Sequence, residues 1–303
     1  MNRRLRGKVV IVDWDDTILP STFVDRWQID NSRDLPLHFQ NLLATLAECA
    51  DRFLAEASKY GEVILITNSD EGWVQFSAEK YCPKLLPVVA KYRIVSARTR
   101  YEKFYPGQPL CWKAAAFAHE VNEIYEKLKE NDSASSCGSM EGTDVSSTSS
   151  MGSLMMDDEE EDATAAVVMN DDSFEQQQLS REIISFGDSN EERTAVKIVS
   201  GQLDARSKSV KFLPAPTLLQ IIGQLYMLTN HMQFVIDSEK ALDMHITQQQ
   251  ADQCAESYLR EHGIHYDENI VPNYIPRSRK TVGEVLARNN IMSFSSTRTP
   301  AFL

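Results

Sequence analysis

Two aspartates, Asp13 and Asp15, stand two residues apart directly after the apolar run of residues 9–12. A short continuous apolar run is typical of a buried parallel strand, and open α/β sheets bind ligands in the crevice beyond the carboxyl ends of such strands. The sequence therefore predicts that both carboxylates lie at a site. A carboxylate pair suits phosphoryl transfer, since one can attack phosphorus while the other moves a proton.

Two more apolar runs, residues 63–66 and 183–186, have the same character and are expected to be neighbouring strands of one sheet. A helix-favouring run lies between them in the chain. The polar residues that follow these strands, or begin that helix, are Thr67, Asn68, Lys113, Asp188 and Glu192. Carboxyl ends of parallel strands meet at one edge, so these side chains are candidates for the same site.

In this order, the segments resemble the four motifs of the haloacid dehalogenase-like (HAD) hydrolase superfamily, in its phosphatase form. Asp13 to Thr17 is similar to its first motif, Thr67 ends the second, Lys113 stands in the third, and Gly187-Asp188 opens the fourth. The resemblance spans residues 9 to about 192 and is loose beyond them. It implies an α/β fold with a Rossmann-like, three-layer parallel sheet and helices on both faces.

The resemblance also implies a role for each residue. Asp13 would be the nucleophile that forms an aspartyl-phosphate, and Asp15 the general acid and base, a residue that favours phosphatase over dehalogenase chemistry. The phosphate group would be bound by Thr67, Asn68 and Lys113. The cofactor would be Mg²⁺, which prefers hard oxygen ligands. Its candidate ligands are Asp13, Asp15, Asp188 and Glu192, with the neighbouring Glu191 left open as an alternative to Glu192.

The expected function is Mg²⁺-dependent hydrolysis of a phosphate monoester. Residues 19–62 and 69–110 leave no room for a large cap over the site, which favours a protein or other macromolecular substrate. Two alternatives stay open. One is a catalytically silent scaffold or regulatory binding protein with the same fold, and the other is a phosphoryl-transfer enzyme that acts on a small metabolite.

Charge patterning divides the chain into three parts. Residues 131–180 contain twelve Asp or Glu and no Lys or Arg, so they account for almost all of the net charge of −13. This serine-rich, acidic composition predicts a disordered insert. The catalytic domain is then expected in residues 1–130 and 181–250, followed by a mainly helical extension in residues 251–303. The insert is a candidate for phosphorylation or for binding regulators, and a solvating spacer is the alternative.

The remaining patterns are less specific. Five cysteines without a Cys-x-x-Cys pair fit a reducing compartment, and the sequence shows neither a membrane span nor a nucleic-acid-binding module. A cytoplasmic location is expected, with a nuclear one as the alternative. Hydrophobic spacing predicts helices over residues 42–60, 216–236 and 281–289, a helix from residue 251, and a strand over residues 209–213.

Overall fold

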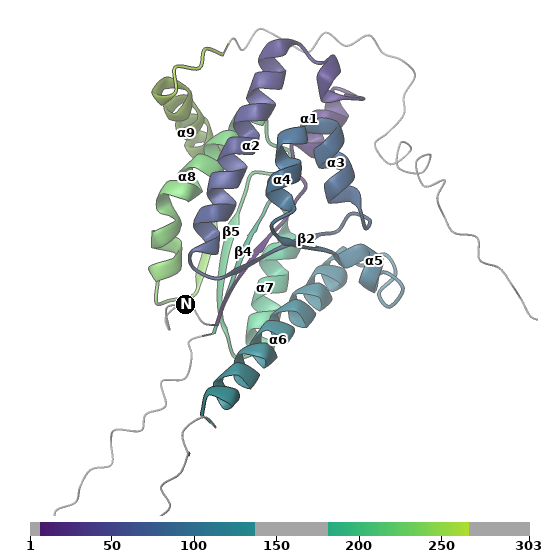
Figure 1. Ribbon diagram of the computed structural model, residues 1–303, viewed down its shortest axis with the longest axis vertical. Helices are drawn as coiled ribbons and strands as arrows, with labels where there is room; N and C mark the ends of the chain where they lie inside the picture. The colour runs from purple at the N-terminus through teal and green to yellow at the C-terminus, as the bar shows by residue number, and fades with distance from the viewer. Residues whose placement is uncertain (1–6, 137–180, 267–303) are drawn as a thin grey trace, which may run out of the picture.

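Six parallel strands form the centre of the protein in the computed structural model, which describes residues 7–136 and 181–266 (Figure 1). Their order across the sheet is β3-β2-β1-β4-β5-β6. The strands are β1 (Lys8–Val12), β2 (Glu62–Thr67), β3 (Arg93–Ser96), β4 (Glu182–Gly187), β5 (Arg206–Lys211) and β6 (Leu242–His245). The three apolar runs of the sequence are the three adjacent central strands β2, β1 and β4, as expected of strands that are covered on both faces.

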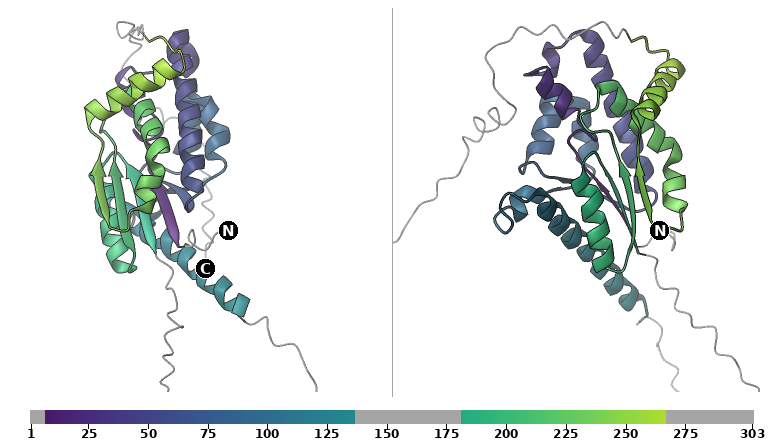
Figure 2. Two further views of the ribbon diagram at one scale, coloured as in Figure 1. Left: turned by 90° about the vertical axis from the view of Figure 1, so that its left-hand side faces the viewer. Right: turned by 180° about the vertical axis from the view of Figure 1, so that it is seen from behind.

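Helices cover both faces of this sheet, because successive side chains of each strand point in opposite directions. In β1, Val10 and Val12 belong to one hydrophobic core, whereas Val9 and Ile11 belong to the other. The first core contains α1 (Ser21–Arg26), α2 (Leu37–Ser58), α3 (Trp73–Tyr81), α4 (Leu86–Val89), α8 (Leu218–Asp237) and α9 (Gln248–Glu261). The second contains α5 (Ala97–Tyr101), α6 (Pro109–Ser136) and α7 (Asn190–Gln202). The predicted α/β fold with a Rossmann-like sheet is confirmed, and Figure 2 shows the helices of the two cores on opposite sides.

The last described helix, α9, packs closely on α8. A Cβ atom added at Gly223 in α8 would lie 2.2 Å from the carbonyl oxygen of Ala251 and 2.7 Å from the backbone nitrogen of Ala255. Only glycine allows the two helices to approach this closely. The first helix of the expected C-terminal extension is therefore part of the first hydrophobic core, and residues 267–303, with the predicted helix 281–289, lie outside the described residues.

Several predicted boundaries differ from the observed ones. The helix predicted over residues 216–236 is confirmed as α8, but the helix expected at residue 42 already begins at Leu37. The strand expected over residues 209–213 is β5, which begins at Arg206 because its polar first half pairs with β4. Strand β6 was not predicted, since its four residues lack an apolar run.

The expected acidic insert begins within a helix. Helix α6 continues to Ser136, past the predicted boundary at residue 131. The rest of the insert, where the sequence predicts disorder, lies outside the described residues.

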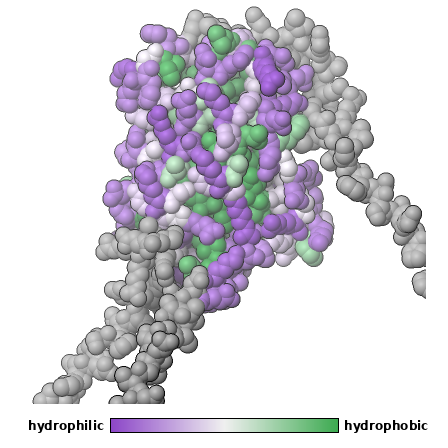
Figure 3. All heavy atoms as spheres, viewed as in Figure 1, coloured by the Kyte–Doolittle hydropathy of each residue, from purple (hydrophilic) through white to green (hydrophobic). Residues whose placement is uncertain are grey.

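In the described part of the chain, every helix is too short or too polar to cross a membrane. Hydrophilic residues cover most of the face seen in Figure 3, with hydrophobic ones gathered near its centre.

Candidate active site

The candidate site lies where the strand order of the sheet reverses. From β1 the chain continues to β2 and β3 on one side, while β4, β5 and β6 follow on the other side. Asp13 comes directly after β1 and Asp188 directly after β4, and the backbone N–H of Asp13 donates to the carbonyl of Phe186 at 2.9 Å. Such a switch point is the usual place for a ligand in an open α/β sheet.

Three carboxylates converge at this point. Oxygen atoms of Asp13, Asp188 and Glu192 all lie within 4.8 Å of one another. Asp13 and Glu192 are buried, and Asp188 is partly exposed. A Cβ atom at Gly187 would lie 2.7 Å from Cγ of Glu192, so the glycine before Asp188 makes room for the third carboxylate. The structure thus brings together three of the four predicted metal ligands.

Lys113 crosses the core from α6 to meet this cluster. The side chain of Lys113 is 1% exposed. Its ammonium lies 2.5 Å from Oδ1 of Asp13, 2.7 Å from Oε1 of Glu192, and 2.8 Å from the carbonyl oxygen of Ile66, to which it donates. Burial alone would lower the pKa of Lys113, but the carboxylates of Asp13 and Glu192 raise it overall. The lysine is therefore a fixed positive charge against Asp13.

Glu192, rather than Glu191, is the glutamate of the cluster. Helix α7 begins with a capping box, in which the side chain of Glu192 accepts from the backbone N–H and hydroxyl of Ser189. Burial would raise the pKa of Glu192, but the lysine at 2.7 Å lowers it overall. Glu191 only donates its backbone N–H to Ser189, and its carboxylate is not part of the cluster.

The electrostatics of the cluster favour an added cation. Burial raises the pKa of Asp13 well above its usual value against the opposing effect of Lys113. Burial, followed by the nearby carboxylate of Glu192, raises the pKa of Asp188 to about 7. One ammonium thus faces three carboxylates. The donor set consists of hard oxygens only, which is the chemistry that Mg²⁺ requires.

Asp15 is not part of the cluster of Asp13, Asp188 and Glu192. Its carboxylate accepts hydrogen bonds from three other side chains. The indole N–H of Trp73 donates to Oδ1 at 2.9 Å, and the hydroxyls of Ser69 and Thr67 donate to Oδ2 at 2.8 and 3.3 Å. Burial raises the pKa of Asp15, and the hydrogen bonds from Trp73 and Ser69 partly offset this effect. The side chain of Asp15, predicted as both acid/base and metal ligand, is thus not among the clustered ligand atoms.

The two other predicted phosphate-binding residues make local contacts. Thr67 accepts from the backbone N–H of Ser69 at 2.9 Å, besides its bond to Asp15. The amide of Asn68 donates to the carbonyl of Pro109, at the start of α6, at 3.3 Å. Its buried Oδ1 has no hydrogen-bond partner among the described residues. Asn68 thereby links the end of β2 to the helix that carries Lys113.

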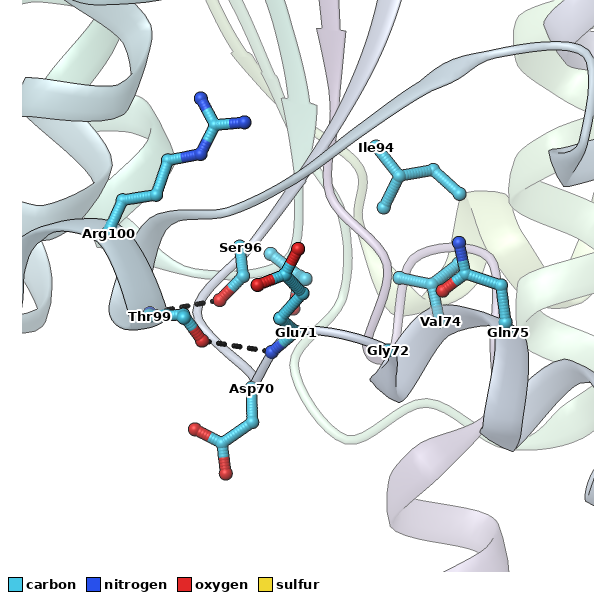
Figure 4. Close-up of a pocket in the computed structure, with 10 residues that line it drawn as sticks. Asp70, Glu71, Gly72, Val74, Gln75, Ile94, Ser96, Thr99 and Arg100 are labelled. Atoms are coloured by element: carbon cyan, nitrogen blue, oxygen red, sulfur yellow. Dashed lines mark hydrogen bonds between the residues drawn. The ribbon is translucent and has the colours of Figure 1, made fainter. Parts of the chain in front are cut away.

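A small cavity adjoins the site between the segment after β2 and the start of α5 (Figure 4). Thr67 lines this cavity and also donates a hydrogen bond to Asp15. On its rim, the backbone N–H of Glu71 donates to the hydroxyl of Thr99, and Ser96 accepts from the backbone N–H of Thr99. The bond from Glu71 holds the segment after β2 against the start of α5.

Sequence reasoning missed two residues that contact Asp15. Ser69 follows Thr67 by two residues, and that proximity to the second motif could have drawn attention to it. Trp73 begins α3 and is 4% exposed, and a buried tryptophan there has the ordinary pattern of a core residue. Only the folded structure shows its indole N–H directed at Asp15.

The chain matches no protein-family model, no curated protein and no solved structure. Its fold and site define an α/β protein with a parallel sheet, a buried acidic cluster at its switch point, and a lysine bound within that cluster.

Proposed function

We propose that this protein is a Mg²⁺-dependent phosphatase of the HAD type, which hydrolyses a phosphate monoester through an aspartyl-phosphate on Asp13. One observation carries the proposal: Asp13 lies at the switch point, bound to the ammonium of Lys113, within a cluster of carboxylates that suits Mg²⁺. A carboxylate can approach an anionic phosphate only where positive charge offsets the repulsion. The site combines that nucleophile with that charge.

The first half of the reaction uses Asp13 and Asp15. An oxygen of Asp13 attacks phosphorus, the new oxygen–phosphorus bond forms, and the bond between phosphorus and the leaving oxygen breaks. Asp15 gives its proton to the leaving oxygen, as a general acid. Lys113, which is held by Asp13 and by the carbonyl of Ile66, offsets charge at the nucleophile.

The second half returns the site to its starting state. Asp15, now a carboxylate, takes a proton from water as the water oxygen attacks phosphorus. The bond between phosphorus and Asp13 breaks, and inorganic phosphate leaves. Asp13, Asp188 and Glu192 would hold Mg²⁺, which supplies positive charge beside the phosphoryl oxygens when bound.

A macromolecular substrate is the favoured class. The chain between β1 and β2 forms α1, a 3-10 turn (Ser32–Asp34) and α2, and the chain between β2 and β3 forms α3, a second 3-10 turn (Pro83–Leu85) and α4. Each of these elements has at least one buried residue, and the four α-helices contribute side chains to the first hydrophobic core. In the described part of the chain, neither connection forms a separate domain above the site. A large substrate could therefore approach it.

Phosphate release tests the proposal directly. Wild-type protein would be incubated with p-nitrophenyl phosphate and with a pool of phosphopeptides, each with and without Mg²⁺. Asp13→Asn is nearly isosteric but cannot form the acyl phosphate, so it should abolish release. Asp51→Asn is the matched control, because it makes the same change in an exposed pair with Lys91, outside the site. It should keep the wild-type rate.

The intermediate offers a second readout. With p-nitrophenyl phosphate, whose leaving group needs little protonation, Asp15→Asn should slow hydrolysis of the acyl phosphate more than its formation. Peptide mass spectrometry after rapid quenching should then find a phosphoryl group on Asp13. Mg²⁺-dependent release that persists in Asp13→Asn would refute the assigned nucleophile. A folded wild-type protein that binds Mg²⁺ but releases no phosphate from any substrate would favour the scaffold alternative.

A further inference from the structure

Asp15 is held in one orientation by side chains from the end of β2, from the loop after it, and from the start of α3. Trp73 donates its indole N–H to Oδ1 at 2.9 Å and lies 3.2 Å from Oδ2, so it bridges the carboxylate. Ser69 donates to Oδ2 at 2.8 Å and Thr67 at 3.3 Å. The residue that would transfer the proton is thus bound by side chains of residues 67–73.

Trp73 differs from the two hydroxyl residues in what its donor can do. A hydroxyl rotates and can either donate or accept, whereas an indole N–H only donates and points where the ring points. The indole N–H of Trp73 therefore donates to the carboxyl group of Asp15 from one fixed direction, whereas the hydroxyls of Ser69 and Thr67 can turn.

The indole itself has little freedom to move. Trp73 is 4% exposed and packs against Phe76 with ring centroids 6.0 Å apart. It is the first residue of α3, after Gly72, whose φ of +84° sets the direction of the helix. A second indole bond joins the same two segments, since Trp14, between the two aspartates, donates to Ser77 of α3 at 2.9 Å. Two hydrogen bonds thus connect α3 to residues 13–15.

We propose that Trp73 is a positioning residue that holds Asp15, through its indole N–H, in the orientation needed to protonate the leaving group. The inference rests on the proposed function, because it assigns Trp73 a role in that reaction. It does not make Trp73 a catalytic residue, since the indole acts through Asp15. Loss of the indole N–H should therefore weaken proton transfer more than substrate binding.

Leaving-group dependence separates this role from a purely structural one. Phenyl phosphate has a poor leaving group that needs a proton, and p-nitrophenyl phosphate has a good one that needs it less. The ratio kcat/KM reports only the steps up to departure of the leaving group, so it isolates the first half of the reaction, in which Asp15 is the acid. Because general acid catalysis contributes about 10²–10⁴-fold, partial misplacement of Asp15 in Trp73→Phe should lower kcat/KM about tenfold on phenyl phosphate and less than about threefold on p-nitrophenyl phosphate.

Trp112→Phe is the matched control. Trp112 is 6% exposed and donates its indole N–H to the carbonyl of Tyr105 at 2.6 Å, away from Asp15. The variant makes the same chemical change at similar burial, so it should cost similar stability but lower kcat/KM equally on both substrates, if at all. Equal losses of kcat/KM on the two substrates in Trp73→Phe, or no loss, would overturn the proposal.

An NMR measurement tests the contact without any activity. The indole ¹⁵N–H resonance of Trp73, identified by its absence in Trp73→Phe, should shift in Asp15→Ala, whereas that of Trp112 should not. An unchanged Trp73 resonance would overturn the inference even in an active enzyme. A wild-type protein that releases no phosphate, but shows the shift, would instead refute the proposed function and leave the contact between Trp73 and Asp15 established.

Discussion

Asp188→Asn should have opposite effects on stability with and without Mg²⁺. The carboxylate of Asp188 is partly buried beside Glu192, and its pKa is raised from 3.8 to about 7. Since the folded protein holds this proton more tightly than the unfolded chain, stability falls as the pH rises from about 4 to about 7. Above pH 7 the full penalty is present. Removal of the charge at pH 8 should therefore stabilise the metal-free protein.

The magnitude follows from the pKa and the exposure. A shift of about three units corresponds to a ceiling of roughly 4 kcal/mol, and solvent screening at a partly exposed group reduces this to about 1–2 kcal/mol. For a domain of this size, 1 kcal/mol corresponds to about 2–4 °C in Tm. Mg²⁺ at a hundred times its Kd should stabilise the wild type by about 2.7 kcal/mol, and Asp188→Asn should lose most of that gain.

Differential scanning fluorimetry at pH 8, with and without Mg²⁺, gives both quantities. The expected pattern is a variant that melts above the wild type in EDTA and below it in saturating Mg²⁺. Its advantage in EDTA should shrink as the pH falls towards 4. A variant that melts below the wild type in EDTA, or keeps the full response to Mg²⁺, would refute the reasoning.

Asp243→Asn is a control of opposite sign. Hydrogen bonds from Arg193, together with the nearby Lys197, lower the pKa of Asp243 from 3.8 to about 2. The interactions of the Asp243 carboxylate with these two cations stabilise the fold above pH 4, and this contribution is lost as the pH falls through about 2. The pair is about one-third exposed, so Asp243→Asn should cost only about 0.5–1 kcal/mol at pH 8, without any dependence on Mg²⁺.

Two further predictions concern the core. Gly223→Ala should destabilise the protein by about 1–3 kcal/mol in urea unfolding, because its Cβ would meet α9 at 2.2 Å, and this outweighs the gain in helix propensity of about 1 kcal/mol. Gly201→Ala, with nothing within 4 Å, should instead gain up to about 1 kcal/mol, and a gain at both positions would contradict the observed helix packing. Lys208→Met should cost about 1–2 kcal/mol, since Lys208 is fully buried 2.8 Å from Oε2 of Glu182, and that carboxylate keeps Arg206 at 2.7 Å as a partner. In combination with Glu182→Gln, the loss should be smaller than the sum of the two single losses, and simple additivity would argue against their coupling.

Local sequence was sufficient for the centre of the fold. The apolar runs before Asp13, Thr67 and Asp188 predicted three strands, and these are adjacent and parallel in the sheet. Because parallel strands place their carboxyl ends at one edge, the same pattern predicted that Asp13 and Asp188 would meet. Lys113 joins them from the helix where the sequence placed it. Amphipathic spacing also located α8 to within two residues at either end.

Contacts between distant residues decided the rest. The sequence left Glu191 and Glu192 as alternatives, and the helical rotation set by the capping box at Ser189 selects Glu192. Strand β5 begins in polar residues because Lys208 finds a partner in Glu182, and no local pattern predicts such a pair. Strand β6 is a strand only because it pairs with β5.

The same division holds at the candidate active site. The sequence by itself determined which residues could do chemistry, since their types and their places after apolar strands are local properties. It did not determine what orients them. The indole of Trp73 reaches Asp15 across 58 positions of the chain, and the ammonium of Lys113 reaches Asp13 across 100. Such contacts exist only once the packing of helices on the sheet has fixed both partners, and the tertiary structure alone decides them.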